Sequence, residues 1–327
     1  MLRDITLVLM SFVSIMDINH HYLFHNFMHT FERDYNVSTF NNKFEVFKDN
    51  VEFIYKHNQL EFKNFTLGIN QYSDFTNDEF KKYTNRKFEK TYLVGSKKCD
   101  KMTVTSKDTP VSIDWRDKNA VTQVKDQGQC GSCWSFSATG AIEGISAITN
   151  KELTSYSEQE LVDCSSKYPY SNHACNGGLM DNAFEYVIDN GLCQEEKYPY
   201  TATKDSCATP CGTKVKINNC YDVPANNELA LKEAVSNQPV SIAIEADTKY
   251  FQSYKSGVLT GDACGTNLDH GVLIAGYGTE DGTDYWLVKN SWSTTWGDEG
   301  YIKIGRSDST NSNGVCGIAM QASYPTI

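Results

Sequence analysis

The sequence has no apolar run long enough to cross a bilayer and no excess of positive charge. Its longest strongly apolar stretch, residues 5–16, has 12 residues, whereas a membrane-spanning helix needs about 20. Acidic residues outnumber Lys and Arg by 41 to 30, for a net charge of −11. An acidic chain lacks the attraction to phosphates that dominates nucleic-acid binding. The composition therefore predicts neither a membrane partner nor a nucleic-acid partner.

Several functional motifs are also missing. The chain contains no internal repeat, no low-complexity segment, no glycine-rich phosphate loop and no HExxH metal motif. Hydrophobic residues make up 40% and charged residues 22% of the 327 residues, which is globular composition and excludes a disordered, collagen-like or coiled-coil chain. The length predicts one to three compact units.

Cysteine and charge are distributed unevenly along the chain. Residues 1–108 hold one cysteine, 15 basic and 14 acidic residues, and residues 109–327 hold ten cysteines, 15 basic and 27 acidic residues. Ten cysteines in the second part predict a disulfide framework made in an oxidising compartment. We therefore expect export through the secretory pathway and interpret residues 1–17 as a signal peptide. A buried N-terminal helix or strand is the alternative.

Hydrophobic periodicity predicts the main elements. Residues 40–55 repeat apolar side chains at steps of three and four, which predicts a helix. Residues 68–74 read as a strand-like piece that ends in a turn, Asn77 can start a short helix, and residues 85–110 read as an exposed, lysine-rich linker. Buried helices are expected from Cys133 and over 179–188. Strands are expected over 240–244, 272–277, 285–288 and 301–304. Helices followed by strands predict an α+β fold.

The candidate nucleophile is Cys133, at the expected start of an apolar helix. Free N–H groups and the helix dipole there favour a thiolate. A second disulfide, a zinc pair and a redox Cys-x-x-Cys pair with Cys130 are the alternatives, and zinc is disfavoured because no second pair has metal spacing. Of the two histidines after residue 109, His173 lies in a polar loop. His270 enters an apolar strand and is either a core group or a base.

Four blocks resemble one protein family. Cys130-Gly-Ser-Cys133-Trp134 is similar to the signature of papain and the cathepsins, which pairs its cysteine with a distant His and Asn. His270 lies 137 residues after Cys133, and Asn290 lies 157 after it in an Asn-Ser-Trp block. Residues 47–58 and 68–74 resemble the two motifs of a cathepsin L-like propeptide. The chain thus resembles a papain-like cysteine protease proform over about residues 20–327.

The resemblance implies the fold and the domain organisation. We expect an inhibitory, mainly helical propeptide over 18–108 and a mature peptidase over 109–327, with a maturation cut within about residues 100–112. The implied peptidase is α+β, with a helical left domain, an antiparallel β-barrel-like right domain and the active-site cleft between them.

The resemblance also implies residue roles. Cys133 would be the nucleophile and His270 the base and acid. Asn290 would orient the His270 ring, and Gln127 would donate an oxyanion-hole N–H beside that of the Cys133 backbone. Trp292 would shield the contact between His270 and Asn290 from water. The remaining implied substrate-binding residues are Gly177, Gly178, Leu179, Met180, Ala243, Leu268, Asp269, Gly271 and Gln321.

The implied disulfides are Cys130–Cys175, Cys164–Cys207, Cys264–Cys316 and a possible Cys193–Cys211. Cys99 and Cys220 are left over. The sequence departs from the family pattern at five positions, one of which is Tyr72, where the second propeptide motif has Phe. Ser293 and Thr295 replace common glycines, which predicts altered contacts on the leaving-group side. Thr39 and Lys43 replace a Glu and an Arg of the propeptide helix, which questions one salt-bridge anchor.

The resulting hypothesis is a cysteine endopeptidase made as a zymogen, with bulky hydrophobic P2 residues preferred. Its expected partners are protein and peptide substrates, its own propeptide as inhibitor, and cystatin-type inhibitors. We expect a monomer that needs no cofactor or metal and resides in a lysosome or vacuole or outside the cell. The alternatives are an inactive papain-fold binding protein and a thiol–disulfide oxidoreductase.

Overall fold

The computed structural model describes residues 19–84, 99–105, 108–208 and 211–327. The expected signal peptide and most of the expected linker lie outside these residues. No helix in the described ranges is both long enough and apolar enough to span a membrane.

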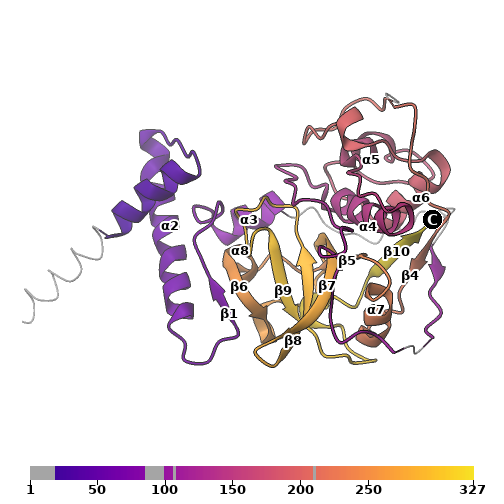
Figure 1. The fold of residues 1–327 in the computed structure, drawn as a ribbon. Helices are drawn as coiled ribbons and strands as arrows, with labels where there is room; N and C mark the ends of the chain where they lie inside the picture. Colours follow the sequence, from indigo (N-terminus) through magenta and orange to yellow (C-terminus); the bar gives the residue numbers. More distant parts are fainter. Residues whose placement is uncertain (1–18, 85–98, 106–107, 209–210) are drawn as a thin grey trace, which may run out of the picture.

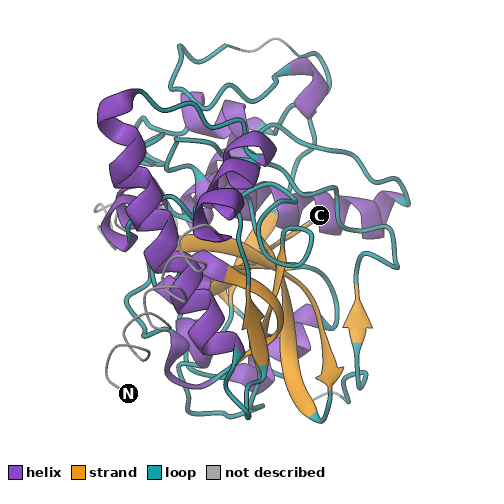
Figure 2. Cartoon of the chain, turned by 90° about the vertical axis from the view of Figure 1, so that its left-hand side faces the viewer, coloured by secondary structure: helices purple, strands orange, loops and turns teal. Residues whose placement is uncertain are grey.

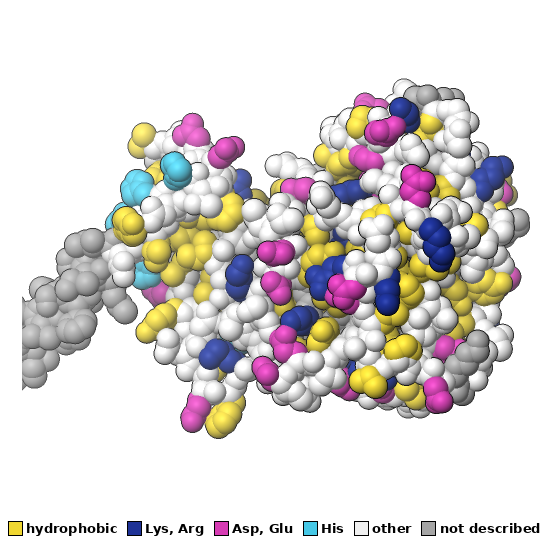
Figure 3. Space-filling view, in the orientation of Figure 1, with side chains coloured by type: hydrophobic (Ala, Val, Ile, Leu, Met, Phe, Trp, Pro, Cys, Tyr) yellow, Lys and Arg dark blue, Asp and Glu magenta, His cyan; other side chains and the backbone are white. Residues whose placement is uncertain are grey.

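The N-terminal part of the chain forms a helical body beside the rest of the molecule (Figure 1). Residues 19–30 are helical, and α2 (Val37–Asn58) contains the predicted 40–55 helix and begins at the Asn36 side chain, which accepts two backbone N–H groups. Short β1 (Phe65–Leu67) and α3 (Asn77–Thr84) follow. The histidine side chains seen on this face gather over this body (Figure 3). Four buried phenylalanines give it a small core of its own: Phe24, Phe27, Phe44 and Phe47.

The expected strand over 68–74 is wrong, because the strand ends at Leu67. Residues 71–74 form a turn instead. The Asn70 side chain accepts the backbone N–H of Tyr72, and Ser73 Oγ accepts that of Asn70. Such local side-chain hydrogen bonds compete with pairing in a sheet, and the alternation of side chains carried no sign of them.

Helices dominate the next part of the chain, as predicted. After two-residue strands β2 (Asp100–Lys101) and β3 (Ile113–Asp114) come α4 (Cys133–Asn150), α5 (Glu158–Cys164), α6 (Met180–Asn190) and the short 3-10 helix η1 (Glu195–Lys197). Helix α4 is buried along most of its length and forms the centre of an apolar cluster with α5 and α6.

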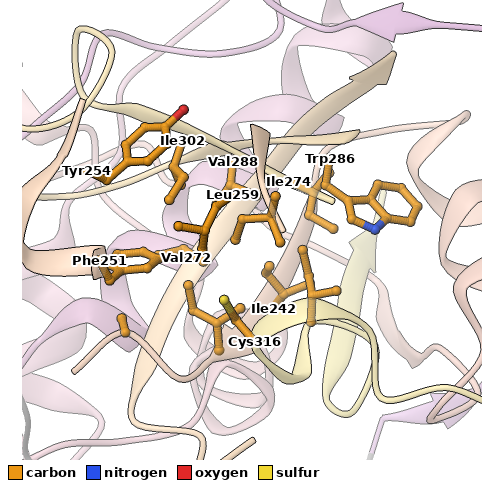
Figure 4. Close-up of a cluster of buried hydrophobic side chains, with 14 of the residues drawn as sticks. Ile242, Phe251, Tyr254, Leu259, Val272, Ile274, Trp286, Val288, Ile302 and Cys316 are labelled. Atoms are coloured by element: carbon orange, nitrogen blue, oxygen red, sulfur yellow. The ribbon is translucent and has the colours of Figure 1, made fainter. Parts of the chain in front are cut away.

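Strands dominate the last part. In chain order the elements are β4 (Asn219–Asp222), α7 (Glu228–Val235), β5 (Val240–Ile244), α8 (Lys249–Ser253), β6 (Tyr254–Leu259), η2 (Gly261–Ala263), β7 (His270–Glu280), β8 (Thr283–Lys289), β9 (Tyr301–Gly305), η3 (Val315–Gly317) and β10 (Ala322–Thr326). They pack around a second core, part of which is seen in Figure 4. The predicted α+β fold is confirmed.

One ten-stranded sheet joins these parts, in the order β1-β6-β9-β8-β7-β5-β10-β4-β2, with β3 beside β7. The pairs are antiparallel except β6 with β9 and β2 with β4. Helix α4 packs against β7, β10 and β5, and α6 packs against β4 and β10. Figure 2 shows helices packed beside the strands. In this arrangement the start of β7 lies against the start of α4, which brings His270 near Cys133.

Candidate active site

Cys133 is the first residue of α4 and the one cysteine in the described residues that forms no disulfide. Burial raises the pKa of its thiol to about 12. The nearby Asp269 charge acts in the same direction, whereas backbone N–H groups of Gly271, Trp134 and Cys133 itself lower the pKa. In this covered state the neutral thiol is therefore the stable form.

Gly271 allows the close approach of β7 to α4. A Cβ atom at this position would lie 3.2 Å from the Trp134 Cα and 3.3 Å from both the Cys133 carbonyl oxygen and the Met180 sulfur. Two of these neighbours are backbone atoms, which cannot move aside as a flexible side chain can. A side chain at position 271 would therefore push β7 and α4 apart by a few tenths of an ångström.

His270 is held by Asn290, as the resemblance implied. The two side chains are joined by a 2.8 Å hydrogen bond between His270 Nε2 and Asn290 Oδ1. The Ser291 backbone N–H also donates to Oδ1, at 2.7 Å. Since this oxygen only accepts, Nε2 carries the ring proton. In the neutral ring Nδ1 then has a free lone pair, and it has no hydrogen-bond partner among the described residues.

Burial also governs the ionisation of His270. It lowers the pKa of the imidazole to about 4, although the hydrogen bond that the ring donates to Asn290 raises the pKa. Trp292 stacks on the ring with the centroids 4.5 Å apart and is itself 1% exposed. The indole thus covers the contact between His270 and Asn290, the position that the resemblance implied.

Gln127 lies where an oxyanion-hole donor is expected. Its Oε1 accepts the Ser291 hydroxyl at 2.6 Å, and its Nε2 donates to the Cys130 carbonyl at 3.0 Å. These contacts fix the buried amide and use one of the two Nε2 protons.

The expected P2 residues surround the same point. Ala243 pairs with Gly271 across β5 and β7, and Met180 and Leu268 join Ala243 in one apolar cluster. Gln321 lies beside Ala243, because the Gln321 carbonyl accepts the Ala243 N–H at 3.0 Å. Its buried Nε2 has no partner among the described residues.

The other implied substrate-binding residues flank this group. Leu179 is buried directly before α6. Gly178 packs so closely that a Cβ would lie 2.7 Å from the Trp134 ring, and Gly177 has a φ of 105°. Asp269 caps the adjacent loop, because its Oδ1 accepts the Ala246 N–H at 2.9 Å.

The propeptide covers the Trp292 side of this site. One of the residues that make this contact, Gln71, was not predicted from the sequence. Gln71 Nε2 donates to the Trp292 carbonyl at 2.7 Å, and Gln71 Oε1 accepts the Thr295 hydroxyl at 2.9 Å. Tyr72 and Phe80 place their rings edge-on against the Trp292 ring, at 5.7 and 5.4 Å. Thr295, one of the two residues that replace common glycines, therefore binds the propeptide.

Ser293 shows why glycine is common in this block. Its φ is 62°, in the left-handed region that side chains disfavour. The questioned anchor of the propeptide helix is present in another form. Lys43 forms an ion pair with Glu79 at 3.0 Å and donates to the Asp74 carbonyl, while Thr39 hydrogen-bonds at the Asn36 cap.

A buried group of charges below the site was also missed. Lys125 lies 2.7 Å from Glu158 and 3.3 Å from Glu143. Burial raises the pKa of Glu158 and lowers that of Lys289, whereas the Lys125 and Lys289 charges overcome burial and lower that of Glu143. Residues this far apart in the sequence have no pattern that would reveal such a group.

All four implied disulfides form, and the two leftover cysteines form a fifth, Cys99–Cys220. Because Cys130 is bonded to Cys175, it cannot serve as the partner of Cys133 in a redox or zinc pair. The geometry is that of a thiol enzyme with one nucleophilic cysteine.

Comparison with known proteins points to the same class of enzyme. Residues 109–326 match the papain family of cysteine proteases, and residues 24–80 match the cathepsin propeptide inhibitor domain. The chain is 49% identical to the probable cysteine protease RD21C of Arabidopsis thaliana over 294 residues, 87% of this chain and 63% of that protein. It is 50% identical to the thiol protease SEN102 of Hemerocallis over 307 residues, 91% of this chain and 83% of that protein.

A solved structure supports the same assignment. Digestive procathepsin L 3 of Tenebrio molitor superposes with a TM-score of 0.84 at 39% identity, covering 94% of this chain and 99% of that one. The chain belongs to the papain family of cysteine proteases. It is a cysteine-type endopeptidase in a cathepsin L-like proform, with its propeptide in place.

Proposed function

We propose that Cys133, His270, Asn290 and Gln127 together hydrolyse peptide bonds through an acyl-enzyme. The observation that carries this proposal is the hydrogen bond that places the ring proton on His270 Nε2. Nδ1 then takes the thiol proton, and the sulfur adds to the scissile carbonyl while Gln127 and the Cys133 N–H hold the oxyanion. The imidazolium returns the proton to the leaving amine, and water releases the acid and restores the thiol.

The buried proform and the open enzyme would differ in protonation. Burial is the first cause of the raised Cys133 pKa and of the lowered His270 pKa. Removal of the pro-region lets water reach both groups and reverses both shifts. The helix dipole and the neighbouring imidazolium then favour the thiolate–imidazolium pair that attacks the substrate.

Substrate preference follows from the P2 pocket. Leu179, Met180 and Leu268 provide apolar walls, and Ala243 and Gly271 leave room for a large side chain. Burial of Leu or Phe there contributes roughly 1.5–3 kcal/mol. Neutral Gln321 offers a buried cation no opposite charge, so P2 Leu or Phe is favoured over P2 Arg by about tenfold or more.

The domain boundaries and the setting are part of the proposal. Residues 1–17 would be a signal peptide, 18–108 the inhibitory propeptide and 109–327 the mature peptidase. Five disulfides support the secretory pathway, and within it we place the enzyme in a lysosome or vacuole or outside the cell. It would act as a monomer on proteins and peptides, and cystatin-type inhibitors would bind its cleft.

The test is acid activation of the purified proform, followed by assay on fluorogenic dipeptides and on a long peptide blocked at both ends. We expect internal cuts in the blocked peptide. Cys133→Ala and His270→Ala should each retain less than about a thousandth of wild-type activity, a barrier increase of ~4 kcal/mol, while His173→Ala should be unchanged. Insulin reduction without peptide cleavage would favour an oxidoreductase, and no turnover by the wild type would favour an inactive binding protein.

A further inference from the structure

The Cys99–Cys220 disulfide joins the expected propeptide to the peptidase. Cys99 lies ten residues before the start of the papain-family match at 109, and Cys220 lies in β4. Both side chains are buried, at 6% and 2% exposure. A peptide cut anywhere between residues 99 and 109 would break the chain and leave this covalent bond intact.

Residues 99–105 are also built into the peptidase sheet. Strand β2 pairs in parallel with β4, with Asp100 beside Tyr221 and Lys101 beside Asp222. The Met102 N–H donates to the Asp222 carbonyl at 2.9 Å, and the Thr105 N–H donates to Glu233 on α7 at 3.0 Å. Figure 1 shows this strand beside β4, at the end of the molecule opposite α2.

Residues 19–84 are attached differently. They meet the peptidase through β1 on β6, through Asn70 and Asn77 on α8 and the loop before it, and through Gln71 on the Trp292 loop. All these contacts are non-covalent, and Cys99 is the first cysteine of the chain. This body can therefore leave as a unit, whereas residues 99–105 cannot.

We propose that residues 99–105 remain in the mature enzyme as an N-terminal extension. The mature chain then begins before residue 109, and the cut that frees the inhibitory body, residues 19–84, lies between Thr84 and Cys99 rather than within residues 100–112. The proposal rests on the zymogen function given above. A cut after Cys99 would keep the inhibitory body tethered at an effective concentration in the mM range. Such a tether would hold the inhibitor on the site even after cleavage, so free active enzyme requires a cut before Cys99.

The retained extension also lines a pocket beside Gln321, the residue expected at the far end of the P2 site. Lys101 and Met102 share a pocket of about 390 Å³ with Gln321 and with two acidic residues, Asp181 and Asp222. Lys101 carries a positive charge on the lining of this pocket, and it would offset Asp181 and Asp222 for a guanidinium that reaches the pocket. We infer that Lys101 disfavours Arg at P2.

The first experiment maps the disulfide without relying on activity. Cys133→Ala proform, digested under non-reducing conditions with free thiols blocked, should give a peptide pair that links Cys99 to Cys220. A free thiol at either position would overturn the proposal. Because this variant is inactive, the measurement stands even if the proposed peptidase function fails.

The second experiment maps the mature enzyme. Wild-type proform is activated in acid without added thiol and separated from released propeptide, and the active species is analysed by intact mass and N-terminal sequencing. We expect a first residue between 85 and 99 and the intact Cys99–Cys220 bond. An active, non-reduced enzyme that lacks Cys99 would overturn the proposal, as would a chain beginning after Cys99 with the whole propeptide still linked.

Two variants complete the test. With Cys99→Ser and Cys220→Ser combined, cuts beyond residue 105 should yield active enzyme that is not seen in the wild type. Lys101→Ala should raise the ratio of kcat/KM for P2 Arg to that for P2 Leu by several-fold, and Lys82→Ala, on α3 of the released body, serves as the matched control. An unchanged ratio would show that the extension does not line the P2 site.

Discussion

Asn290→Ala isolates the contribution of the amide that orients the catalytic imidazole. The hydrogen bond that it removes is 2.8 Å long and lies between residues that are 0% and 3% exposed. The variant leaves His270 Nε2–H as a buried donor without a partner, which costs about 1–3 kcal/mol. If the transition state loses that amount, kcat/KM falls about 5- to 150-fold. Trp292 still stacks on the ring, so the loss should remain well below that of His270→Ala.

The pH profile distinguishes this role from a general structural one. The hydrogen bond from His270 to Asn290 raises the pKa of the imidazole, because Oδ1 stabilises the protonated ring. Its loss lowers that pKa, so the alkaline limb of kcat/KM, where the imidazolium is lost, should move to lower pH. The assay is a fluorogenic dipeptide with P2 Leu from pH 4 to 9, corrected for active-site concentration.

Matched variants make the result decisive. His173→Ala removes an exposed histidine of the same domain and should change neither the rate nor the profile. The reasoning is refuted if Asn290→Ala keeps the wild-type rate and alkaline limb. It is equally refuted if the loss matches that of His270→Ala, since orientation alone would not then explain the role of the amide.

Three further predictions follow from single contacts. Gln321→Glu should raise kcat/KM for P2 Arg at pH values above the pKa of the new carboxylate, whereas Gln321→Met should not. Equal wild-type rates on Arg-Arg and Leu-Arg substrates would contradict the assignment of Gln321 to the P2 pocket. Burial acts to raise the pKa of Glu79, but hydrogen bonds from Thr76 and Lys43 lower it overall. The stabilisation that the Glu79 carboxylate gives to the propeptide is therefore present above the pKa of the unfolded chain, and it is lost as the pH falls through the pKa of the folded chain. Glu79→Gln should therefore speed processing near neutral pH and converge with wild type in acid, and an effect equal to that of exposed Glu45→Gln would refute this. Gly271→Ala should cost about 1–3 kcal/mol of stability by overpacking. Its Tm should be lower than that of Gly212→Ala, where a Cβ meets nothing within 4 Å. Equal Tm values would argue against the close approach of β7 to α4.

The residues proposed as catalytic could be selected from the sequence because they belong to short motifs in a fixed order. Cys133, His270 and Asn290 each lie in a recognisable block, and the fold brings those blocks together. The pairing of Cys99 with Cys220 could not be predicted, since it depends on where β2, directly after Cys99, joins the sheet. The contact of Gln71 with Thr295 likewise joins two loops 224 residues apart, whose sequences do not depend on each other in any visible way.

The strand order has a consequence for the two borders of the sheet. Both outer strands, β1 beside β6 and β2 beside β4, precede residue 109. Open strand borders present rows of unused backbone donors and acceptors, which invite association with other chains. In the zymogen β1 covers the edge of β6, and β2 covers part of the edge of β4. Departure of the inhibitory body opens the β6 border, where Gly257 lies so close to the Asn64 carbonyl that a Cβ would be 2.4 Å away, while the disulfide keeps β2 on the β4 border. Activation therefore changes the sheet on one side only, and self-association of the processed enzyme would begin at β6.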